Sequence, residues 1–381
     1  MKPAFEVADI LQNNWDSIEN KEIKLNSWQL RTLSAIKRCR TAELGGHIDL
    51  CSSCGYIRIS YNSCRNRHCP KCQGHKTEEW VQARHSELLP VPYYHVVFTI
   101  PDMLNVYALQ YPKELYSILF KASWQTIDAF SKDQKWVGAK MGMIGILHTW
   151  GQNLSLHPHL HCIVPGGGVT EQGNWKTAKV LKSGKASKIL FPVKAMSKVF
   201  RGKFIALLKK KIPQIPYEFY PKLYEHNWVV YAKRPFGGAE QVVEYLGRYT
   251  HKIAISNHRI KNVSNDSVTF TYKDYRHKAK KKIMTLTQKE FIRRFSLHIL
   301  PKRFVRIRHY GILSSYWKRE KLKELQVSLD FTPLTQTIQT KNHQCPKCKN
   351  HSLQVVFQFD ARGPPKNWLK MIEKYNRQNI N

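Results

Sequence analysis

The sequence is short of acidic residues and has no long apolar run. Its 381 residues include 27 Asp or Glu against 62 Lys or Arg, a formal net charge of +35 at pH 7. No stretch approaches the roughly 18 to 20 apolar residues that span a bilayer. The N-terminus also has no apolar core of signal-peptide length. We therefore expect a protein that does not enter membranes and that stays in the cytoplasm where it is made.

The positive charge belongs to a folded protein rather than to a disordered tail. Hydrophobic residues make up 42% of the chain and aromatic residues 12%, which is more than a disordered basic segment contains. A folded surface this basic repels itself unless it meets a polyanion, and nucleic acid is the commonest such partner. A membrane surface is the weaker alternative. The composition thus predicts a nucleic-acid-binding protein associated with the nucleoid.

Two CxxC pairs predict a structural zinc site. Cys51 with Cys54 and Cys69 with Cys72 are separated by fourteen residues, close to the spacing that supplies four thiolates to one tetrahedral ion. In a reducing cytosol this grouping indicates metal ligation rather than disulfides. A closed four-ligand site leaves no position for water or substrate, so the zinc organises structure.

The same stretch offers more ligands than one ion needs. Cys64 or His68 could replace one of the four cysteines, and a second ion is a further alternative, since His47 and His75 also lie here. The plainer interpretation is that these extra side chains only pack or form hydrogen bonds. A late half-site could bind an ion alone, and it offers His343, Cys345, Cys348 and His351.

The pattern of the chain predicts an α+β fold on a largely antiparallel sheet. Strand-like runs stop at proline or glycine, and helical spacing of apolar residues returns between them. Strands are expected at 93–101, 141–149, 157–164, 228–235 and 267–275, and helices within 1–46, after 101, at 194–211, at 239–253 and after Thr287, where Glu290 completes a capping box. Three parts follow from this: a helical and zinc-binding DNA-recognition module at 1–90, a nuclease-type domain at 91–320 and a basic tail with a CxxC knuckle at 321–381.

A His-x-His pair on the strand at 157–164 is a candidate metal site. His159 and His161 lie on one face with Cα atoms about 6.6 Å apart, a span that two imidazoles can close around one cation. His157 is on the same face but about 13 Å from His161. The third ligand is therefore expected from His95, from Gln152, or from His157 after a local bend. Alone, such a pair is more often two half-exposed strand histidines.

Two tyrosines on the segment 239–253 are candidate nucleophiles. Tyr245 and Tyr249 are four residues apart and so share one face of the expected helix. Periodicity by itself favours core packing for Tyr249. A chemical role requires its hydroxyl to reach the metal site, with Arg248, Lys252 and the ion favouring the phenolate.

Several stretches in one order resemble the rolling-circle insertion-sequence transposases of the HUH endonuclease superfamily. They are CRTAELGGH, YNSCRNRHCPKCQ, ELLPVPYYHVVFTIP, HPHLHCIVPGGG, YLGRYTHKIAISNHRI and LPKRFVRIRHYGIL, between about residues 40 and 320. On this resemblance His159 and His161 match the metal pair, and Tyr245 and Tyr249 match the two-tyrosine signature.

The resemblance implies cleavage and transfer of single-stranded DNA at element ends. It also implies Mg or Mn at the nuclease site and an N-terminal zinc-binding domain. We expect Tyr249 to attack first because it lies nearer the basic end of its helix, beside Lys252. Single-stranded or hairpin DNA is then the partner, and a homo-oligomer is compatible with the sequence.

A basic stretch after the tyrosines fits the same substrate. From Lys273 to Arg308 there are thirteen Lys or Arg and two acids, with aromatic residues between them that either stack on unpaired bases or form a core. These aromatics are Tyr275, Phe291, Phe295 and Phe304. The residues expected to contact DNA are Arg248, Lys252, Arg293, Arg294, Lys302, Arg303, Arg306 and Arg308.

Three other functions compete with a strand transferase. A metal-dependent hydrolase would use the histidine site to activate water. A replication initiator or plasmid relaxase would use a related tyrosine mechanism. A non-catalytic zinc DNA-binding protein would have no cleavage to lose when His161 is replaced.

Overall fold

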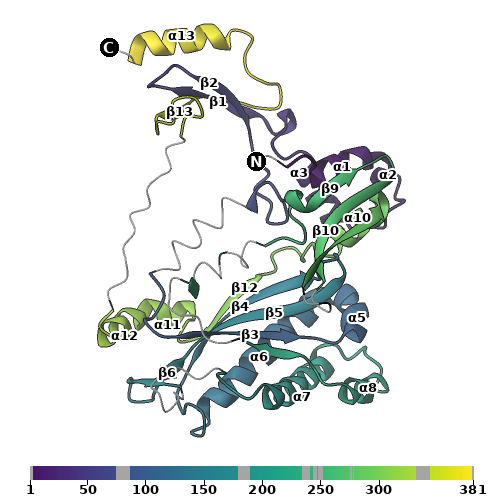
Figure 1. The fold of residues 1–381 in the computed structure, drawn as a ribbon, viewed down its shortest axis with the longest axis vertical. Coiled ribbons are helices and arrows are strands. Elements are labelled where there is room, and N and C mark those ends of the chain that lie inside the picture. The colour runs from purple at the N-terminus through teal and green to yellow at the C-terminus, as the bar shows by residue number, and fades with distance from the viewer. Residues whose placement is uncertain are drawn as a thin grey trace.

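The computed structural model describes residues 3–73, 86–178, 189–233, 241–242, 247, 252–274, 277, 279–331 and 344–379. Helices and antiparallel sheets alternate along the chain, which confirms the predicted α+β class (Figure 1). Within these ranges no helix has the length and apolar character needed to cross a bilayer.

A five-stranded antiparallel sheet forms the centre of the molecule. Its strands are β3 (Tyr93–Thr99), β4 (Gly142–Trp150), β5 (Leu156–Pro165), β8 (Val230–Ala232) and β12 (Ile307–Gly311), in the order β12-β4-β5-β3-β8. Every residue of β4 is buried, because both faces of the sheet are covered. The strands expected at 141–149 and 157–164 are β4 and β5, and they pair with each other in antiparallel fashion.

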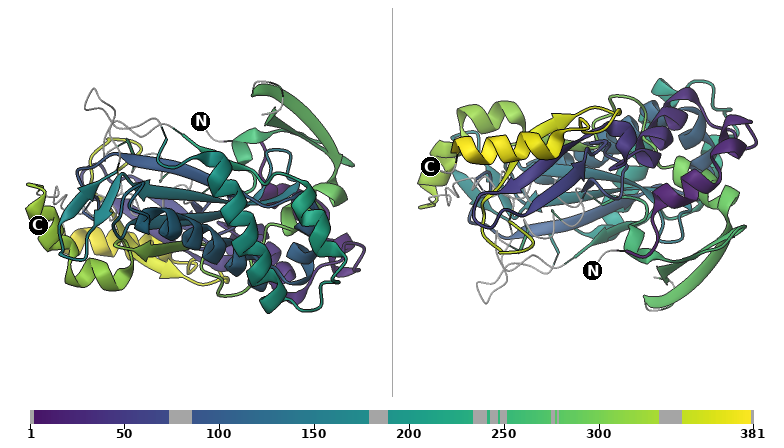
Figure 2. Two further views of the ribbon diagram at one scale, coloured as in Figure 1. Left: turned by 90° about the horizontal axis from the view of Figure 1, so that it is seen from below. Right: turned by 90° about the horizontal axis from the view of Figure 1, so that it is seen from above.

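Helices cover one face of this sheet. They are α5 (Asn105–Gln110), α6 (Pro112–Lys132), α7 (Val193–Lys211) and α8 (Phe219–Glu225), and Figures 1 and 2 show α6 and α7 running across the strands. Phe98, Leu147 and Leu160 point into the same core as Leu119 of α6 and Phe204 of α7. Because successive strand residues alternate between faces, the neighbours of these residues belong to the other face.

The opposite face carries a second core. Ile144, Ile146 and Ile163 pack there against residues that include Leu313 and Trp317. The elements nearby are α11 (Ser315–Glu320) and α12 (Leu322–Ser328), with the small hairpin β6 (Gly167–Val169) and β7 (Trp175–Thr177) at one end.

The N-terminal helices pack on a second sheet and share its core. The helices are α1 (Val7–Asn13), α2 (Trp15–Glu19) and α3 (Ser27–Lys37), and the sheet consists of β9 (Ile260–Val263), β10 (Ser267–Asp274) and β11 (Lys280–Thr287), followed by α10 (Gln288–Ser296). Leu33 of α3 is in one cluster with Phe270 and Phe291. The side chain of Thr287 accepts the Glu290 N–H at 3.2 Å, which is the N-cap half of the predicted capping box. The Glu290 carboxylate pairs with Arg293 and Arg294.

A third sheet brings the two ends of the chain together. It consists of β1 (Gly46–Cys51), β2 (Ile57–Tyr61) and β13 (Leu353–Phe359), with β1 in the middle, and α13 (Trp368–Asn379) lies over it (Figure 1). Short 3₁₀ turns occur at η1 (Ala42–Leu44), η2 (Asp102–Leu104) and η3 (Asn257–Arg259). The late segment predicted as a tail therefore completes a sheet that begins near the N-terminus.

Two glycines test the central sheet and its helical layer. Gly311, at the end of β12, has φ +59°, and a Cβ there would lie 1.9 Å from the Met141 carbonyl oxygen. We expect Gly311→Ala to lower the free energy of unfolding by more than about 2 kcal/mol. Gly202, inside α7, has open space around it, so Gly202→Ala should raise it by about 0.5 to 1 kcal/mol. Urea unfolding of both variants measures this; equal effects would contradict the β12–β4 register.

Candidate active site and metal centres

Three histidines on the two central strands form the candidate nuclease metal centre. One ring nitrogen each from His148, His159 and His161 lies within 4.8 Å of the other two. His148 of β4 is the cross-strand partner of His159 of β5, and His161 follows two residues later on the same face. The antiparallel register thus brings three imidazoles together, and three such ligands leave further coordination positions for a substrate oxygen.

Hydrogen bonds orient two of these rings. The Nδ1–H of His159 donates to the carbonyl of His157 at 2.6 Å. Nδ1 of His161 lies 2.9 Å from Nε2 of His95, and the two rings stack at an interplanar angle of 6°. Contacts of this kind fix the orientation of metal-binding imidazoles in proteins. Nδ1 is thus engaged in both rings.

Burial keeps these imidazoles in the form that binds metal. It lowers the pKa of His159 to about 4 and that of His161 well below 6.5. The same cause lowers the pKa of His95 to about 3. All three rings are therefore neutral at pH 7 and can donate a lone pair to a cation.

The structure gives the side-chain contacts of His95 and His157, two of the three residues expected to supply the third ligand, and a backbone contact of Gln152. His95 stands behind His161 as a hydrogen-bond partner. The Gln152 carbonyl accepts a hydrogen bond from Arg259, and Nδ1 of His157 lies 3.7 Å from a carboxylate oxygen of Asp102. The third member of the group is instead His148. Sequence reasoning missed it, although the paired strands 141–149 and 157–164 contained the signal.

Tyr245, Arg248 and Tyr249 lie outside the described residues, but both flanks of their segment are described. Val242 is fully buried, in one cluster with Ile144, Ile146 and Ile163, on the face of the sheet that bears the histidines. At the other flank, Lys252 is close enough for its charge to add to the effect of burial on the pKa of His159 and His161.

Two arginines fix the chain that follows Lys252. Nη1 of Arg306 donates to the Lys252 carbonyl at 3.1 Å. Arg259 donates to the carbonyls of Ala254 and Thr271 at 3.4 and 2.7 Å, and also to that of Gln152. Burial lowers the pKa of Arg306 to about 10, so it stays charged at pH 7. Its charge-assisted bond therefore helps to hold this segment near the β4–β5 hairpin.

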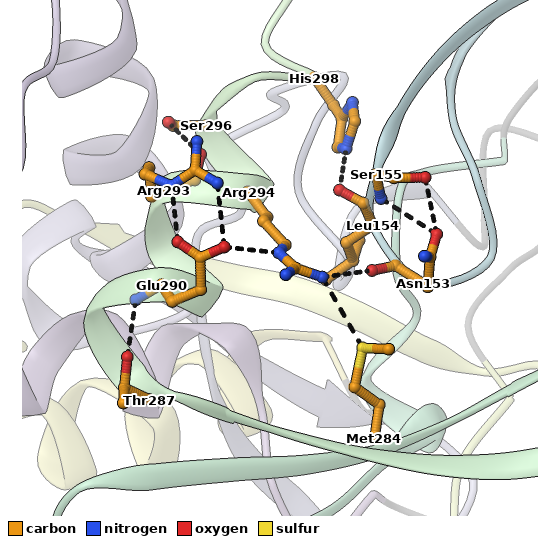
Figure 3. A network of polar contacts seen from close by, with 10 residues as sticks. All are labelled: Asn153, Leu154, Ser155, Met284, Thr287, Glu290, Arg293, Arg294, Ser296 and His298. Carbon is orange, nitrogen blue, oxygen red and sulfur yellow. Dashed lines mark hydrogen bonds and ion pairs between the residues drawn. The ribbon is translucent and has the colours of Figure 1, made fainter. Parts of the chain in front are cut away.

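The turn between β4 and β5 is tied to α10, as Figure 3 shows. Arg294 donates from Nη1 to the Asn153 carbonyl at 3.3 Å and from Nε to Glu290 at 2.7 Å. The Nε2–H of His298 donates to the Leu154 carbonyl at 3.2 Å. Since this turn joins the two histidine-bearing strands, α10 helps to set the position of the metal ligands.

The cysteines form two clusters rather than the single site expected from sequence. Cys69 and Cys72 join Cys64 and Cys39, with Sγ of Cys72 at 3.5 Å from that of Cys39 and 3.7 Å from that of Cys64. Cys64, the alternative ligand considered from the sequence, therefore lies in this cluster. Cys39, which directly follows α3 and its C-cap, was missed because it belongs to no CxxC pair.

Cys51 and Cys54 do not share an ion with Cys69 and Cys72. They lie with Cys345 and Cys348, with Sγ distances of 3.6 Å between Cys51 and Cys348 and 3.7 Å between Cys54 and Cys345. The expectation of one site from both early pairs is thus wrong, because the pairing of β13 with β1 places the late half-site beside Cys51. Each cluster offers four thiol ligands, the donor set of a structural zinc site.

His68 lies outside both cysteine clusters. Its Nε2 accepts the Leu300 N–H at 3.4 Å, and burial lowers its pKa well below 6.5. The neighbouring Arg67 donates to the carbonyl of Pro301 at 3.1 Å and to that of Phe304. Arg67 and His68, just before Cys69, therefore connect this cysteine cluster to the loop after α10.

The basic residues expected to contact DNA divide into those that are packed against other parts of the protein and those that are exposed. Arg306 is buried, and Arg308 donates to Ser117 at 3.2 Å and lies 4.4 Å from the ring centroid of Phe120. Lys302 and Arg303 are exposed, and Arg293 on α10 pairs with Glu290. The aromatics Phe291, Phe295 and Phe304 are buried, so they form a core, and Tyr275 lies outside the described residues.

Comparison with known proteins gives matches to both halves of the chain. A family described as "Transposase zinc-binding domain" matches residues 10–100, and a family described as "Putative transposase" matches residues 142–321. "Putative transposase y4qJ" of Sinorhizobium fredii is 38% identical over 396 residues, 95% of this chain and 98% of its own. The transposase for insertion sequence element IS801 of Pseudomonas savastanoi pv. phaseolicola is 29% identical over 308 residues, 76% of this chain and 72% of its own. No solved structure matches the chain.

The contacts of Arg294 predict a larger effect on stability than those of Arg293. Arg294→Met removes a charged hydrogen bond to the β4–β5 turn and should lower the free energy of unfolding by about 2 kcal/mol. Arg293→Met removes an ion pair within α10 and should cost less than about 1 kcal/mol. Urea unfolding at pH 7.5 compares the two. Equal losses would contradict a role for Arg294 in holding the turn.

His298 predicts a loss of stability in acid. Burial lowers its pKa from 6.5 to about 4, so between these pH values the unfolded chain binds a proton that the native chain does not. Stability therefore falls as pH drops through this window, by about 2 kcal/mol at pH 5 for this one group. His298→Gln should reduce the difference in unfolding free energy between pH 7.5 and pH 5.0 by that amount. An unchanged difference would show that His298 is protonated in the native state.

Proposed function

This chain belongs to the IS91-type transposases, and from that premise we propose that it cleaves single-stranded DNA at the ends of its element. Cleavage forms a 5′-phosphotyrosine link, and the attached strand is then transferred by a rolling-circle mechanism. The reaction takes place on DNA in the bacterial cytoplasm, at the nucleoid. Single-stranded or hairpin ends are the substrate.

One observation carries the proposal: the two flanks of the tyrosine segment meet the face of the sheet that holds the histidines. Val242 packs on Ile144, Ile146 and Ile163, and Lys252 is within electrostatic range of His159 and His161. The positions of these two flanks support the proposal that the tyrosine hydroxyls act at the histidine group.

The histidine group fits a divalent ion. Three imidazoles within 4.8 Å of one another match the ligand number of catalytic metal sites. When bound, the ion would polarise a non-bridging phosphate oxygen and stabilise the charge that develops there. Because imidazole nitrogen suits Mn²⁺ better than Mg²⁺, we expect Mn²⁺ to support activity at lower concentration.

The chain itself supplies the nucleophile. The Tyr249 phenolate attacks the scissile phosphorus, a Tyr–O–P bond forms, and the bond from phosphorus to the 3′ oxygen breaks. That oxygen takes a proton from water and leaves as a 3′ hydroxyl. The phenol has already lost its own proton to solvent, an ionisation that the cationic groups of Lys252 and Arg248 favour. Bond energy is conserved in the phosphotyrosine, so the strand can be rejoined without ATP.

Tyr245 gives the site a second nucleophile. It can accept a second strand while the first stays attached to Tyr249. The exposed Lys302 and Arg303 are suited to hold the DNA backbone, since phosphate contacts position a strand without reading its sequence. Lys280, Lys281 and Lys282 of β11 are also exposed and are suited to further phosphate contacts.

The proposal is tested with labelled single-stranded ends of the element, incubated with the protein and Mn²⁺ or Mg²⁺ and resolved on a denaturing gel. The wild type should give a covalent protein–DNA adduct and a free 3′ hydroxyl. The double variant Tyr249→Phe/Tyr245→Phe should lower the yields of covalent adduct and of joined strand by at least about 100-fold. If the double variant still cuts, the protein is a hydrolase that activates water.

The third metal ligand is tested in the same assay. His148→Ala should lose cleavage and Mn²⁺ binding, measured by calorimetry. His157→Ala should keep both, because its ring pairs with Asp102 and its carbonyl still accepts from His159. A different result would indicate a non-catalytic DNA-binding protein. In that case the wild type, His161→Ala and His148→Ala would all bind DNA equally well, and none of the three would cut it.

A further inference from the structure

The cluster of Cys51, Cys54, Cys345 and Cys348 lies between two segments almost 300 positions apart in the chain. We propose that it binds a second structural zinc ion, which fastens the C-terminal segment to the N-terminal zinc-binding region. The transposase-family match at 142–321 and the zinc-domain match at 10–100 both leave Cys345 and Cys348 outside. We call this four-cysteine site the terminal clasp.

The two CxxC turns of the terminal clasp have the same backbone geometry. Gly55 N–H donates to the Cys51 carbonyl at 2.9 Å, and Lys349 N–H donates to the Cys345 carbonyl at 2.9 Å. The residue after the second cysteine has φ +69° in one turn, at Gly55, and φ +65° in the other, at Lys349. Two independent sequences thus fold into matching knuckles that face each other, as in a four-thiolate zinc site.

A second pair of bonds repeats in both knuckles. The N–H of Cys51 donates to the Tyr56 carbonyl at 2.9 Å, and that of Cys345 donates to the Asn350 carbonyl at 2.8 Å. Lys349 is not glycine, so its left-handed conformation costs about 1 kcal/mol or more. A bond to a metal at the adjacent Cys348 is the kind of interaction that offsets such a cost.

Contacts around the sulfurs are those of a metal-binding knuckle. The hydroxyl of Ser352 lies 3.1 Å from Sγ of Cys51 and accepts a bond from the Ser53 hydroxyl at 2.8 Å. Hydroxyl groups in this position orient thiolate ligands and stabilise their charge. Sulfur distances of 3.6 and 3.7 Å fit four thiolates around one ion, each about 2.3 Å from it, and are too long for disulfide bonds.

The sheet that carries the terminal clasp has little apolar core of its own. Among the residues that the structure describes, the buried hydrophobic side chains here are Ile48 and Leu50 of β1 and Ile372 of α13, with Leu353 beside the cysteines. A core this small stabilises a sheet weakly, and small modules of this kind depend on a metal. Zinc removal should therefore release β13 from β1.

The test is the zinc content of the purified full-length protein, measured by mass spectrometry of the metal. Cys345→Ser with Cys348→Ser should remove one zinc per chain relative to the parent. Cys51→Ser with Cys54→Ser should remove one, and the fourfold variant should also remove only one. This shared loss distinguishes one four-thiolate ion from two half-sites. Cys162→Ala, which alters a buried cysteine of the main core, is the control and should remove none.

Two further measurements keep the proposal open to refutation if a variant folds poorly. Hydrogen exchange should speed up at 353–359 in the Cys345→Ser/Cys348→Ser protein while β4 and β5 keep their protection. X-ray absorption of the wild-type zinc should give a first shell dominated by sulfur. Unchanged zinc content in the Cys345→Ser/Cys348→Ser protein, or a further loss in the fourfold variant, would overturn the terminal clasp. None of these readouts uses DNA, so they fail or succeed independently of the proposed cleavage reaction.

Discussion

The antiparallel register of β4 and β5 is the constraint on which the candidate active site depends. His148 opposes His159 across the pair, and His161 follows on the same face. A shift of one residue in either strand would turn its histidines toward the largely apolar core under α6 and α7. Arg294 of α10 contacts Asn153, and His298, which follows α10, contacts Leu154. Both contacts therefore act on the turn that sets this register.

Sequence reasoning recovered what is local and periodic. The β4–β5 hairpin, α7 and the N-cap at Thr287 follow from alternation, helical spacing and side-chain chemistry within a few residues. The His159 and His161 pair belongs to this class, because two positions on one strand fix their own face.

Contacts between segments far apart in the sequence could not be predicted from local patterns. His148 could have been found only by knowing which residue opposes His159, and that depends on the length of the turn. Cys39 has no CxxC partner, and the partners of Cys51 lie near the opposite end of the chain. Equal spacing made Cys69 and Cys72 look like the natural partners of Cys51 and Cys54. Likewise, Arg306 and Arg308 were predicted to be surface cations. The sequence does not show that Arg306 contacts a backbone carbonyl or that Arg308 lies over aromatic rings.

The pairing of β13 with β1 has a consequence for biosynthesis. Cys51 and Cys348 are 297 positions apart, so a ribosome has to make nearly the whole polypeptide before β1 gains its partner on this side. Contacts of such long range form late and slow the final stage of folding. A nascent chain that stops early would emerge with one edge of β1 unpaired, and edges of that kind promote aggregation. Completion of the N-terminal sheet thus requires that translation has passed Phe359.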